Sequence, residues 1–217
     1  MKEYTSNIIK ELIEYYPRLD YLEENLIKAV NEIVKRVQSG GKILVCGNGG
    51  SASDSEHIVG ELLKEFYIKR PIDQDFTKKY QELFKDGSSR IEEGLQGGIP
   101  AISLVSQTGF LTAYGNDVSF DMAYAQQVYV YGNANDVFLG LSTSGNASNV
   151  FNAAKVAKAK DMLVISFTGQ NGGKLKDVSD ILLNSPSTET FMVQEHHLPL
   201  YHTICRAVEF EIFGDEK

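Results

Sequence analysis

The sequence predicts an α/β fold in which a five-stranded parallel sheet is flanked by helices. Five short apolar runs alternate with longer stretches in which apolar residues recur every three or four positions, and this alternation is typical of buried parallel strands joined by helices. The chain has 217 residues, of which 42% are apolar and 23% are charged, an ordinary composition for one compact domain with a substantial core. We therefore expect a single domain over residues 1–217.

The first forty residues predict a helical hairpin. Apolar residues recur at helical spacing from Ile8 to Ile13 and, after Pro17, from Leu22 to Val37. Gly40 and Gly41 are expected to end the second helix.

The strands are expected at the five apolar runs. These runs are Lys42–Gly47, Ile99–Ser106, Asp136–Ser142, Met162–Gly169 and Asp180–Ser185. A helix is expected over Asn149–Lys160, and a long C-terminal helix over about Glu189–Phe213, with Pro199 as a kink.

One segment interrupts this alternation. Ile72–Gly97 is polar, carries a helical pattern around Phe76–Phe84 and is longer than a simple strand-to-helix-to-strand unit requires. We expect an insertion at the edge of the sheet, either as a lid over the site or as a solvated surface hairpin or helix. If it is a lid, the positive charges near it are Lys69, Arg70, Lys78 and Lys79.

Charge and hydropathy exclude several classes of protein. The formal net charge is −8, so the broad basic surface of a nucleic-acid-binding protein is missing. The N-terminus lacks the apolar core of a signal peptide and no run approaches eighteen apolar residues. We expect a soluble cytoplasmic protein without membrane association, in which Cys46 and Cys205 are reduced core residues.

The glycine-rich stretch after the first strand has two nucleotide-binding interpretations, and both are weak. A Walker loop requires a lysine that this stretch lacks. Gly47, Gly49 and Ala52 match the dinucleotide pattern G-x-G-x-x-A. A dinucleotide unit, however, reaches its second strand and an acidic residue within about thirty residues, whereas the next strand here begins near Ile99.

The third interpretation is a phosphate cradle. Ser51 and Ser53 lie beside the free backbone N–H groups of a starting helix, which favour an anion. A second loop, Ser142–Asn146, has similar chemistry after another strand. The competing explanation is that these serines only cap helices. Two such loops at one edge of a sheet favour a site for a phosphate monoester.

The four histidines suggest a metal site. His57 and Glu61 are four residues apart on a predicted helix and share a face, and zinc accepts both imidazole nitrogen and carboxylate oxygen. Gln194 and His202 lie eight apart on the last helix, about 12 Å along an ideal helix. They can meet at one ion only if Pro199 bends that helix or if different copies of the chain supply them.

These motifs together resemble a known family. The segments GKILVCGNGGSASDSEHIVGE, GND at Gly115–Asp117, LSTSGN, VISFTGQNGGKL and VQEHHLPLYH resemble the sugar isomerase (SIS) fold and, within it, the phosphoheptose isomerases, which act on sedoheptulose 7-phosphate. The resemblance covers nearly the whole chain except Ile72–Gly97. It implies a homotetramer with active sites between subunits and one zinc ion per subunit.

The resemblance also implies roles for individual residues. Zinc would be held at His57, Glu61, Gln194 and His202. Substrate contacts would fall to Asn48, Gly49, Gly50, Ser51, Asn116, Asp117, Ser142, Thr143, Ser144 and Gln194. The implied reaction is isomerisation of an aldose and a ketose through an enediol, with Glu61 as base and His202 as acid, serving heptose synthesis for surface polysaccharide.

Departures from the family pattern leave the sugar open. Glu65 stands where the family usually has arginine, Phe191 and Met192 stand where it has an Asp-Arg pair, and Ala147 stands where it often has serine. Alternatives are therefore an isomerase of another sugar phosphate and a non-catalytic SIS protein that binds a sugar phosphate or a protein partner. The non-catalytic relatives that bind a replication initiator lack the histidine equivalent to His202, so its presence favours an enzyme.

Overall fold

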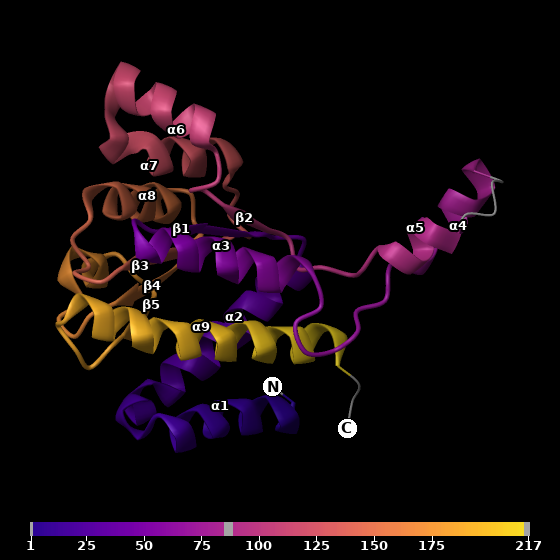
Figure 1. The fold of residues 1–217 in the computed structure, drawn as a ribbon, viewed down its shortest axis with the longest axis horizontal. Helices are drawn as coiled ribbons and strands as arrows, with labels where there is room; N and C mark the ends of the chain where they lie inside the picture. The colour runs from indigo at the N-terminus through magenta and orange to yellow at the C-terminus, as the bar shows by residue number, and fades with distance from the viewer. Residues whose placement is uncertain (1, 85–88, 215–217) are drawn as a thin grey trace.

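The expected five-stranded parallel sheet is present in the computed structural model, which describes residues 2–84 and 89–214 (Figure 1). The strands are β1 (Ile43–Cys46), β2 (Ala101–Ser103), β3 (Val137–Ser142), β4 (Leu163–Thr168) and β5 (Ile181–Asn184). The helices are α1 (Glu3–Tyr15), α2 (Glu23–Gln38), α3 (Gly50–Leu63), α4 (Gln74–Leu83), α5 (Ser89–Gly94), α6 (Thr108–Tyr114), α7 (Phe120–Tyr131), α8 (Ser148–Ala159) and α9 (Thr190–Phe213). Short helical turns η1 (Pro17–Leu22), η2 (Gly115–Ser119) and η3 (Gly173–Asp177) complete the described elements.

Helices cover both faces of the sheet, and successive residues of each strand point into opposite faces. Val45 belongs to the core shared with α1, α2, α3 and α9, whereas Leu44 belongs to the core shared with α7 and α8. Figure 1 shows α1, α2 and α9 on one side of the sheet and α7 and α8 on the other. The N-terminal hairpin, the long last helix and the two-sided sheet are thus confirmed.

The strand order is β2-β1-β3-β4-β5, with every neighbouring pair parallel. The chain direction across the sheet reverses between β1 and β3, and ligands of open α/β sheets bind beyond the carboxyl ends of strands at such a point. The fold therefore places the loops after β1 and β3 beside each other.

The second strand is shorter than its apolar run suggested. β2 covers only Ala101–Ser103, because Ser106 N donates to Ser103 O and the chain turns there. The last helix extends to Phe213 with Pro199 inside it, as expected, and the kink at Pro199 stays a prediction. Cys46 and Cys205 are buried and free, as expected.

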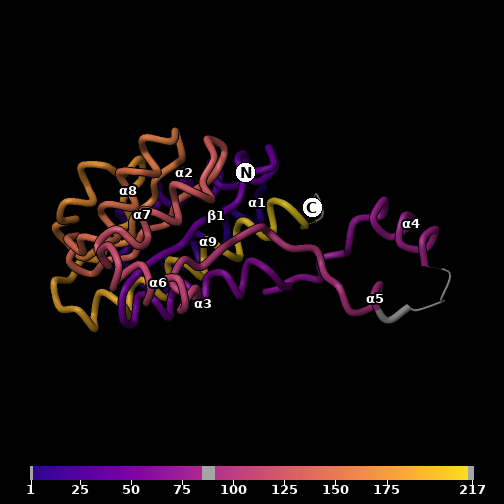
Figure 2. The backbone as a smooth tube through the Cα atoms, turned by 90° about the horizontal axis from the view of Figure 1, so that it is seen from above, coloured from indigo at the N-terminus to yellow at the C-terminus, as the bar shows by residue number. Residues whose placement is uncertain are grey.

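The insertion forms a helical hairpin of α4 and α5, which Figures 1 and 2 show projecting away from the body of the protein. Its residues 85–88 lie outside the described residues. The two ends meet at the base, where Gly97 N donates to Arg70 O at 2.9 Å. In one copy of the chain the hairpin does not cover the loops after β1 and β3, which favours the surface-hairpin interpretation over a lid.

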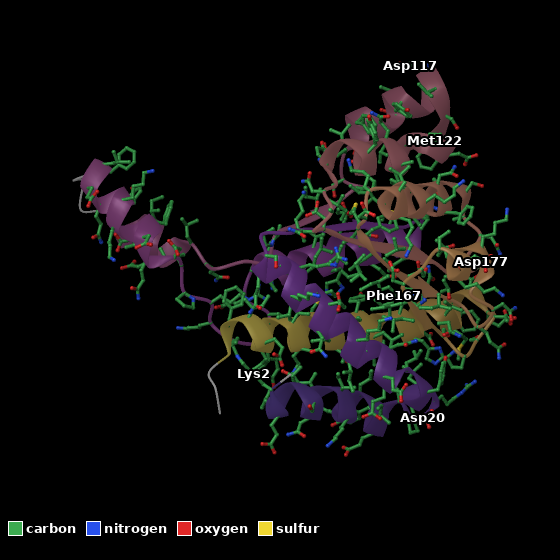
Figure 3. The ribbon with its side chains drawn as sticks, turned by 180° about the vertical axis from the view of Figure 1, so that it is seen from behind. Lys2, Asp20, Asp117, Met122, Phe167 and Asp177 are labelled. Atoms are coloured by element: carbon green, nitrogen blue, oxygen red, sulfur yellow. The ribbon has the colours of Figure 1, made fainter. Side chains whose placement is uncertain are left out.

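A second projection, the arm of α6, η2 and α7, was not foreseen as a separate feature. It follows β2 and packs on α8 through α7, and Figure 3 shows Asp117 at its outer end. None of the helices in the described part of the chain is long and apolar enough to cross a membrane.

Candidate active site

The glycine loop and the S-T-S-G-N loop form one cavity. It measures about 360 Å³ and lies beyond the carboxyl ends of β1 and β3. It is lined by Asn48, Gly49, Gly50, Ser51, Leu141, Ser142, Thr143, Ser144, Ala147, Thr190 and Gln194. Eight of the ten residues expected to contact substrate are among them.

Two glycines shape the floor of this cavity. Gly49 has φ +56°, a left-handed conformation that residues with a side chain rarely adopt. A Cβ atom on Gly50 would lie 2.3 Å from Gln194 Nε2. The second glycine is therefore what allows Gln194 of α9 to reach the start of α3.

The serines of the two loops are not helix caps. The N-cap residues of α3 and α8 are Gly49 and Ala147, and neither makes a side-chain capping hydrogen bond. The capping explanation therefore fails for both helices. Asn48 and Asn149 exchange amide hydrogen bonds of 2.8 and 2.9 Å, which tie the two loops together. Both helices begin at the cavity, and the positive end of a helix dipole favours an anion.

A second cluster lies two turns along α3. His57 Nε2 is 3.2 Å from Glu61 Oε1 and 3.4 Å from His202 Nε2. The His57 side chain is 43% exposed and that of Glu61 is 14% exposed, so the cluster opens to the surface. Lys64 Nζ lies 3.2 Å from Glu61 Oε2. Burial, and then the proximity of His57, lowers the pKa of His202 below its ordinary value of 6.5.

Buried Tyr201 and half-buried Asp54 lie next to the His57 ring on the side away from Glu61. The Tyr201 hydroxyl is 3.0 Å from His57 Nδ1 and 3.3 Å from Asp54 Oδ1. Burial raises the pKa of both the Asp54 carboxyl and the Tyr201 phenol above their ordinary values. Neither residue was singled out from the sequence, although Tyr201 directly precedes His202 and Asp54 shares a face of α3 with His57.

The donor atoms of the second cluster fit part of a zinc site. Tetrahedral zinc ligands at about 2.0–2.1 Å from the ion lie about 3.3–3.4 Å from each other, close to the two separations around His57 Nε2. No group of three His, Cys, Asp or Glu side chains within residues 2–84 and 89–214 stands ready to hold a metal.

Gln194 is not part of this cluster. It lies beside Gly50 in the cavity, at the other end of the segment where α3 and α9 pack together. Three of the four expected zinc ligands are thus brought together within one chain, and the fourth is not. Asn116 and Asp117 do not line the cavity. They lie on η2, where Asn116 Nδ2 donates to Asp117 Oδ1 at 2.9 Å.

Of the positions that depart from the family pattern, Ala147 and Phe191 lie at or beside the cavity, whereas Glu65 lies at the base of the insertion. Ala147 lines the cavity, and Phe191, which is 60% exposed, follows the lining residue Thr190. Glu65 donates its backbone N–H to the side chain of Gln96 at the base of the insertion. The cavity therefore has a less charged rim than the family pattern suggests.

The expected replacement charges do not reach the cavity. Arg70 is buried in an ion pair with Glu209, with Nε 2.7 Å from Oε1. It also donates to the backbone oxygens of Glu61 and Leu62, so it secures the end of α3 and is not free to bind a sugar. Lys78 pairs with Asp75 on the hairpin, and the other two lysines, Lys69 and Lys79, are exposed outside the cavity.

Comparison with known proteins identifies the family of this chain. The family model described as SIS domain matches residues 7–97 and 96–169. A phosphoheptose isomerase of Burkholderia pseudomallei (strain K96243) is 37% identical over 198 residues, covering 89% of this chain and 87% of the relative. The phosphoheptose isomerase 2 of Campylobacter jejuni is 37% identical over 196 residues, covering 88% and 85%. The structure of phosphoheptose isomerase GmhA from Neisseria gonorrhoeae aligns with a TM-score of 0.70 at 33% identity, covering 94% of this chain and 92% of that one.

Proposed function

The chain belongs to the SIS domain family and, within it, to the phosphoheptose isomerases, and on that premise we propose that it interconverts sedoheptulose 7-phosphate and glycero-manno-heptose 7-phosphate. The observation that carries the proposal is the pairing of two features on α3 and α9. One is a cavity lined by hydroxyls and a helix N-terminus, and the other is a cluster of two imidazoles and a carboxylate. The first suits a phosphorylated sugar and the second suits proton transfer.

The cavity would bind the phosphate end of the sugar. Ser51, Ser142, Thr143 and Ser144 offer hydroxyl groups, and the start of α3 offers the positive end of a helix dipole. Helix N-termini bind phosphate in this way without a nearby arginine. Gln194 would orient the sugar chain from the opposite wall.

The cluster would move the protons. Glu61 is assigned as the base that removes the proton from the carbon beside the carbonyl, and His202 as the group that handles the proton on oxygen. The pKa of His202 is lowered below its ordinary value of 6.5, so its imidazole is neutral near pH 7. A neutral imidazole can act as an acid toward a developing enediolate.

We further propose that His57, Glu61 and His202 hold zinc, one ion per subunit. Their nitrogen and oxygen donors match the preferences of that ion, and two of their separations match edges of its coordination shell. Bound zinc would polarise the oxygens of the sugar and stabilise negative charge on them.

The separation of Gln194 from His202 favours a site shared between subunits of a homotetramer. A mixture of the inactive variants Gln194→Ala and His202→Ala, denatured and refolded together, tests this. If different chains supply the two residues to one site, mixed oligomers contain some intact sites and regain part of the activity. If one chain supplies both, the mixture stays inactive.

The acid and base assignment is tested by following the aldoheptose formed from sedoheptulose 7-phosphate. We expect turnover by the zinc-loaded protein, loss of turnover after removal of the metal with a chelator, and recovery when zinc is returned. Glu61→Gln and His202→Ala should each lower kcat by about 10²-fold or more. Glu56→Gln, an exposed position on the same helix, is the matched control and should retain kcat. Normal turnover by both site variants would show that the assignment is wrong.

The same assay separates the remaining alternatives. Turnover of a different phosphorylated aldose or ketose, with none of the heptose, would indicate an isomerase of another sugar. Binding of sugar phosphate without turnover of any would indicate a non-catalytic SIS protein.

A further inference from the structure

Tyr201 lies between His57 and Asp54 in the packed interface of α3 and α9. Its hydroxyl is 3.0 Å from His57 Nδ1 and 3.3 Å from Asp54 Oδ1. The Tyr201 side chain is only 2% exposed. The phenol therefore links the imidazole to a carboxylate through two hydrogen bonds.

A single proton on the phenol decides the direction of this link. The Tyr201 hydroxyl donates to Asp54 Oδ1, because an ionised carboxylate can only accept. The phenol oxygen is then the acceptor for the N–H of His57 Nδ1. In that tautomer the other ring nitrogen, Nε2, carries the lone pair, and Nε2 is the atom that faces Glu61 and His202.

The Asp54 carboxylate has no other compensation in the described part of the chain. Its Oδ2 atom is buried without a hydrogen-bond partner, and none of the ion pairs among the described residues includes Asp54. A carboxylate with one buried, unpartnered oxygen is stabilised by positive charge placed nearby. Through Tyr201, the Asp54 carboxylate is connected to the His57 ring. The stabilising positive charge would therefore lie on that ring or on a cation bound to it.

Aromatic contacts with Tyr201 also fix the orientation of the His57 and His202 rings. Tyr201 meets the His57 ring edge-on with centroids 5.5 Å apart and meets the His202 ring edge-on at 4.9 Å. Both imidazoles that face Glu61 thus pack against the same phenol. Rotation of either ring would break a hydrogen bond or an aromatic contact.

We propose that Tyr201 and Asp54 form a positioning pair that holds His57 with its proton on Nδ1 and presents Nε2 to a divalent cation. The inference rests on the proposed function, because it assigns the pair to the proposed zinc site. Groups that accept a hydrogen bond from the far nitrogen of a metal-binding histidine fix its orientation and strengthen binding. Here the phenol would transmit that effect from the carboxylate.

Zinc affinity of the full chain, measured by competition with a chromophoric chelator at fixed pH, tests the pair. Tyr201→Phe keeps the ring and removes only the hydroxyl, and we expect it to weaken zinc binding about 10- to 100-fold. Asp54→Asn should weaken binding by a similar factor. Because the two residues act through one link, the double variant should be no weaker than the weaker single variant. Tyr21→Phe is the control, since it removes another tyrosine hydroxyl, which donates to Asn184 O far from the cluster.

The control variants separate failure of this inference from failure of the proposed function. If His57→Ala weakens zinc binding while Tyr201→Phe binds as tightly as Tyr21→Phe, the pair has no positioning role and the inference is wrong. If His57→Ala leaves zinc binding unchanged, the proposed metal site is wrong. The tautomer of His57 then tests whether Tyr201 and Asp54 position this ring.

That tautomer is measured on the metal-free protein by ¹⁵N NMR with labelled histidine, of which the chain has four. We expect the proton on Nδ1 in the wild type and its redistribution toward Nε2 in Tyr201→Phe. A proton on Nε2 in the wild type would overturn the inference. Thermal unfolding of each metal-free variant checks that the fold is intact.

Discussion

Gly50 is the residue on which the shape of the cavity depends most directly. A Cβ atom there would lie 2.3 Å from Gln194 Nε2, so Gly50→Ala must displace the Gln194 side chain from the cavity wall. We expect kcat/KM to fall on the order of 10²-fold, the loss that misplacement by about 1 Å can cause. Gly60→Ala, on the same helix with open space at its Cβ, should leave kcat/KM unchanged. Equal kinetics for both variants would show that Gln194 is not needed in the cavity.

Arg70 and Glu209 form a fully buried ion pair that holds the end of α3 next to Glu61. Glu209 also accepts from the backbone N–H groups of Phe66 and Tyr67, each at 2.9 Å. Removing one partner of such a pair leaves an uncompensated buried charge, which costs about 3–5 kcal/mol. We therefore expect Glu209→Gln to lower the free energy of unfolding by several kcal/mol in urea titrations.

The exposed pair of Lys78 and Asp75 on the hairpin provides the control for that measurement. Its side chains are 70% and 91% exposed, and solvent screens such pairs. Asp75→Asn should leave the unfolding midpoint unchanged. A Glu209→Gln midpoint equal to that of Asp75→Asn would contradict the structural role of the buried pair.

His197 makes the stability of the fold depend on pH. Burial lowers its pKa from 6.5 to about 4, and its Nε2 contacts Thr168 O. Since the unfolded chain takes up this proton at higher pH than the folded chain, stability is full above about pH 6.5. It falls as the pH drops toward 4, by on the order of 3 kcal/mol in total.

Urea unfolding at pH 7 and pH 5, at one protein concentration, checks this sign. His197→Asn should remove much of the loss between the two values, whereas His196→Asn, at a more exposed position, should retain most of it. An unchanged pH dependence in His197→Asn would assign the loss to other groups.

At the scale of elements, the insertion is separable from the fold. Its ends are joined by the hydrogen bond from Gly97 N to Arg70 O at 2.9 Å, so residues 72–96 can be removed and the gap closed with a short turn. We expect the shortened chain to retain its thermal unfolding midpoint within a few degrees and its kcat for the sugar phosphate. Loss of kcat with an intact fold would instead indicate that the hairpin acts on a site, in its own subunit or a neighbouring one.

The elements that the sequence predicted well are those with strong periodicity. The amphipathic patterns of α1 and α2 extend over 13 and 16 residues, long enough to show the helical period. The apolar runs of β1, β3, β4 and β5 are shorter and were identified by their alternation with helical segments. The arm of α6 and α7 was missed because α7 has buried and exposed apolar residues around its whole circumference, including Val128 and Tyr129. Such a helix has no single apolar face to read.

The candidate site was only partly predictable for a different reason. Loop motifs identified the cavity because glycine and serine must follow the strands at fixed positions. Asn149, Tyr201 and Asp54 contribute through contacts between elements far apart in the sequence, such as the exchange between Asn48 and Asn149. Spacing along the chain carries no signal for contacts of that kind.

At the scale of the whole molecule, charge and fold agree on the kind of ligand. The chain has a net charge of −8, so it does not attract phosphates by its overall field. Binding must come from local geometry, which the reversal of chain direction between β1 and β3 supplies by placing two helix N-termini at one cavity. The proposed function therefore requires that a phosphorylated sugar binds in this cavity and is isomerised beside Glu61 and His202.

The most direct test is to incubate the zinc-loaded protein with sedoheptulose 7-phosphate in D₂O and to follow the sugars by NMR. We expect that an aldoheptose 7-phosphate appears and that at least part of it carries deuterium at C2, because the enediol takes its proton from a group that exchanges with solvent. If the intact, zinc-loaded protein forms no aldoheptose, the central claim is wrong.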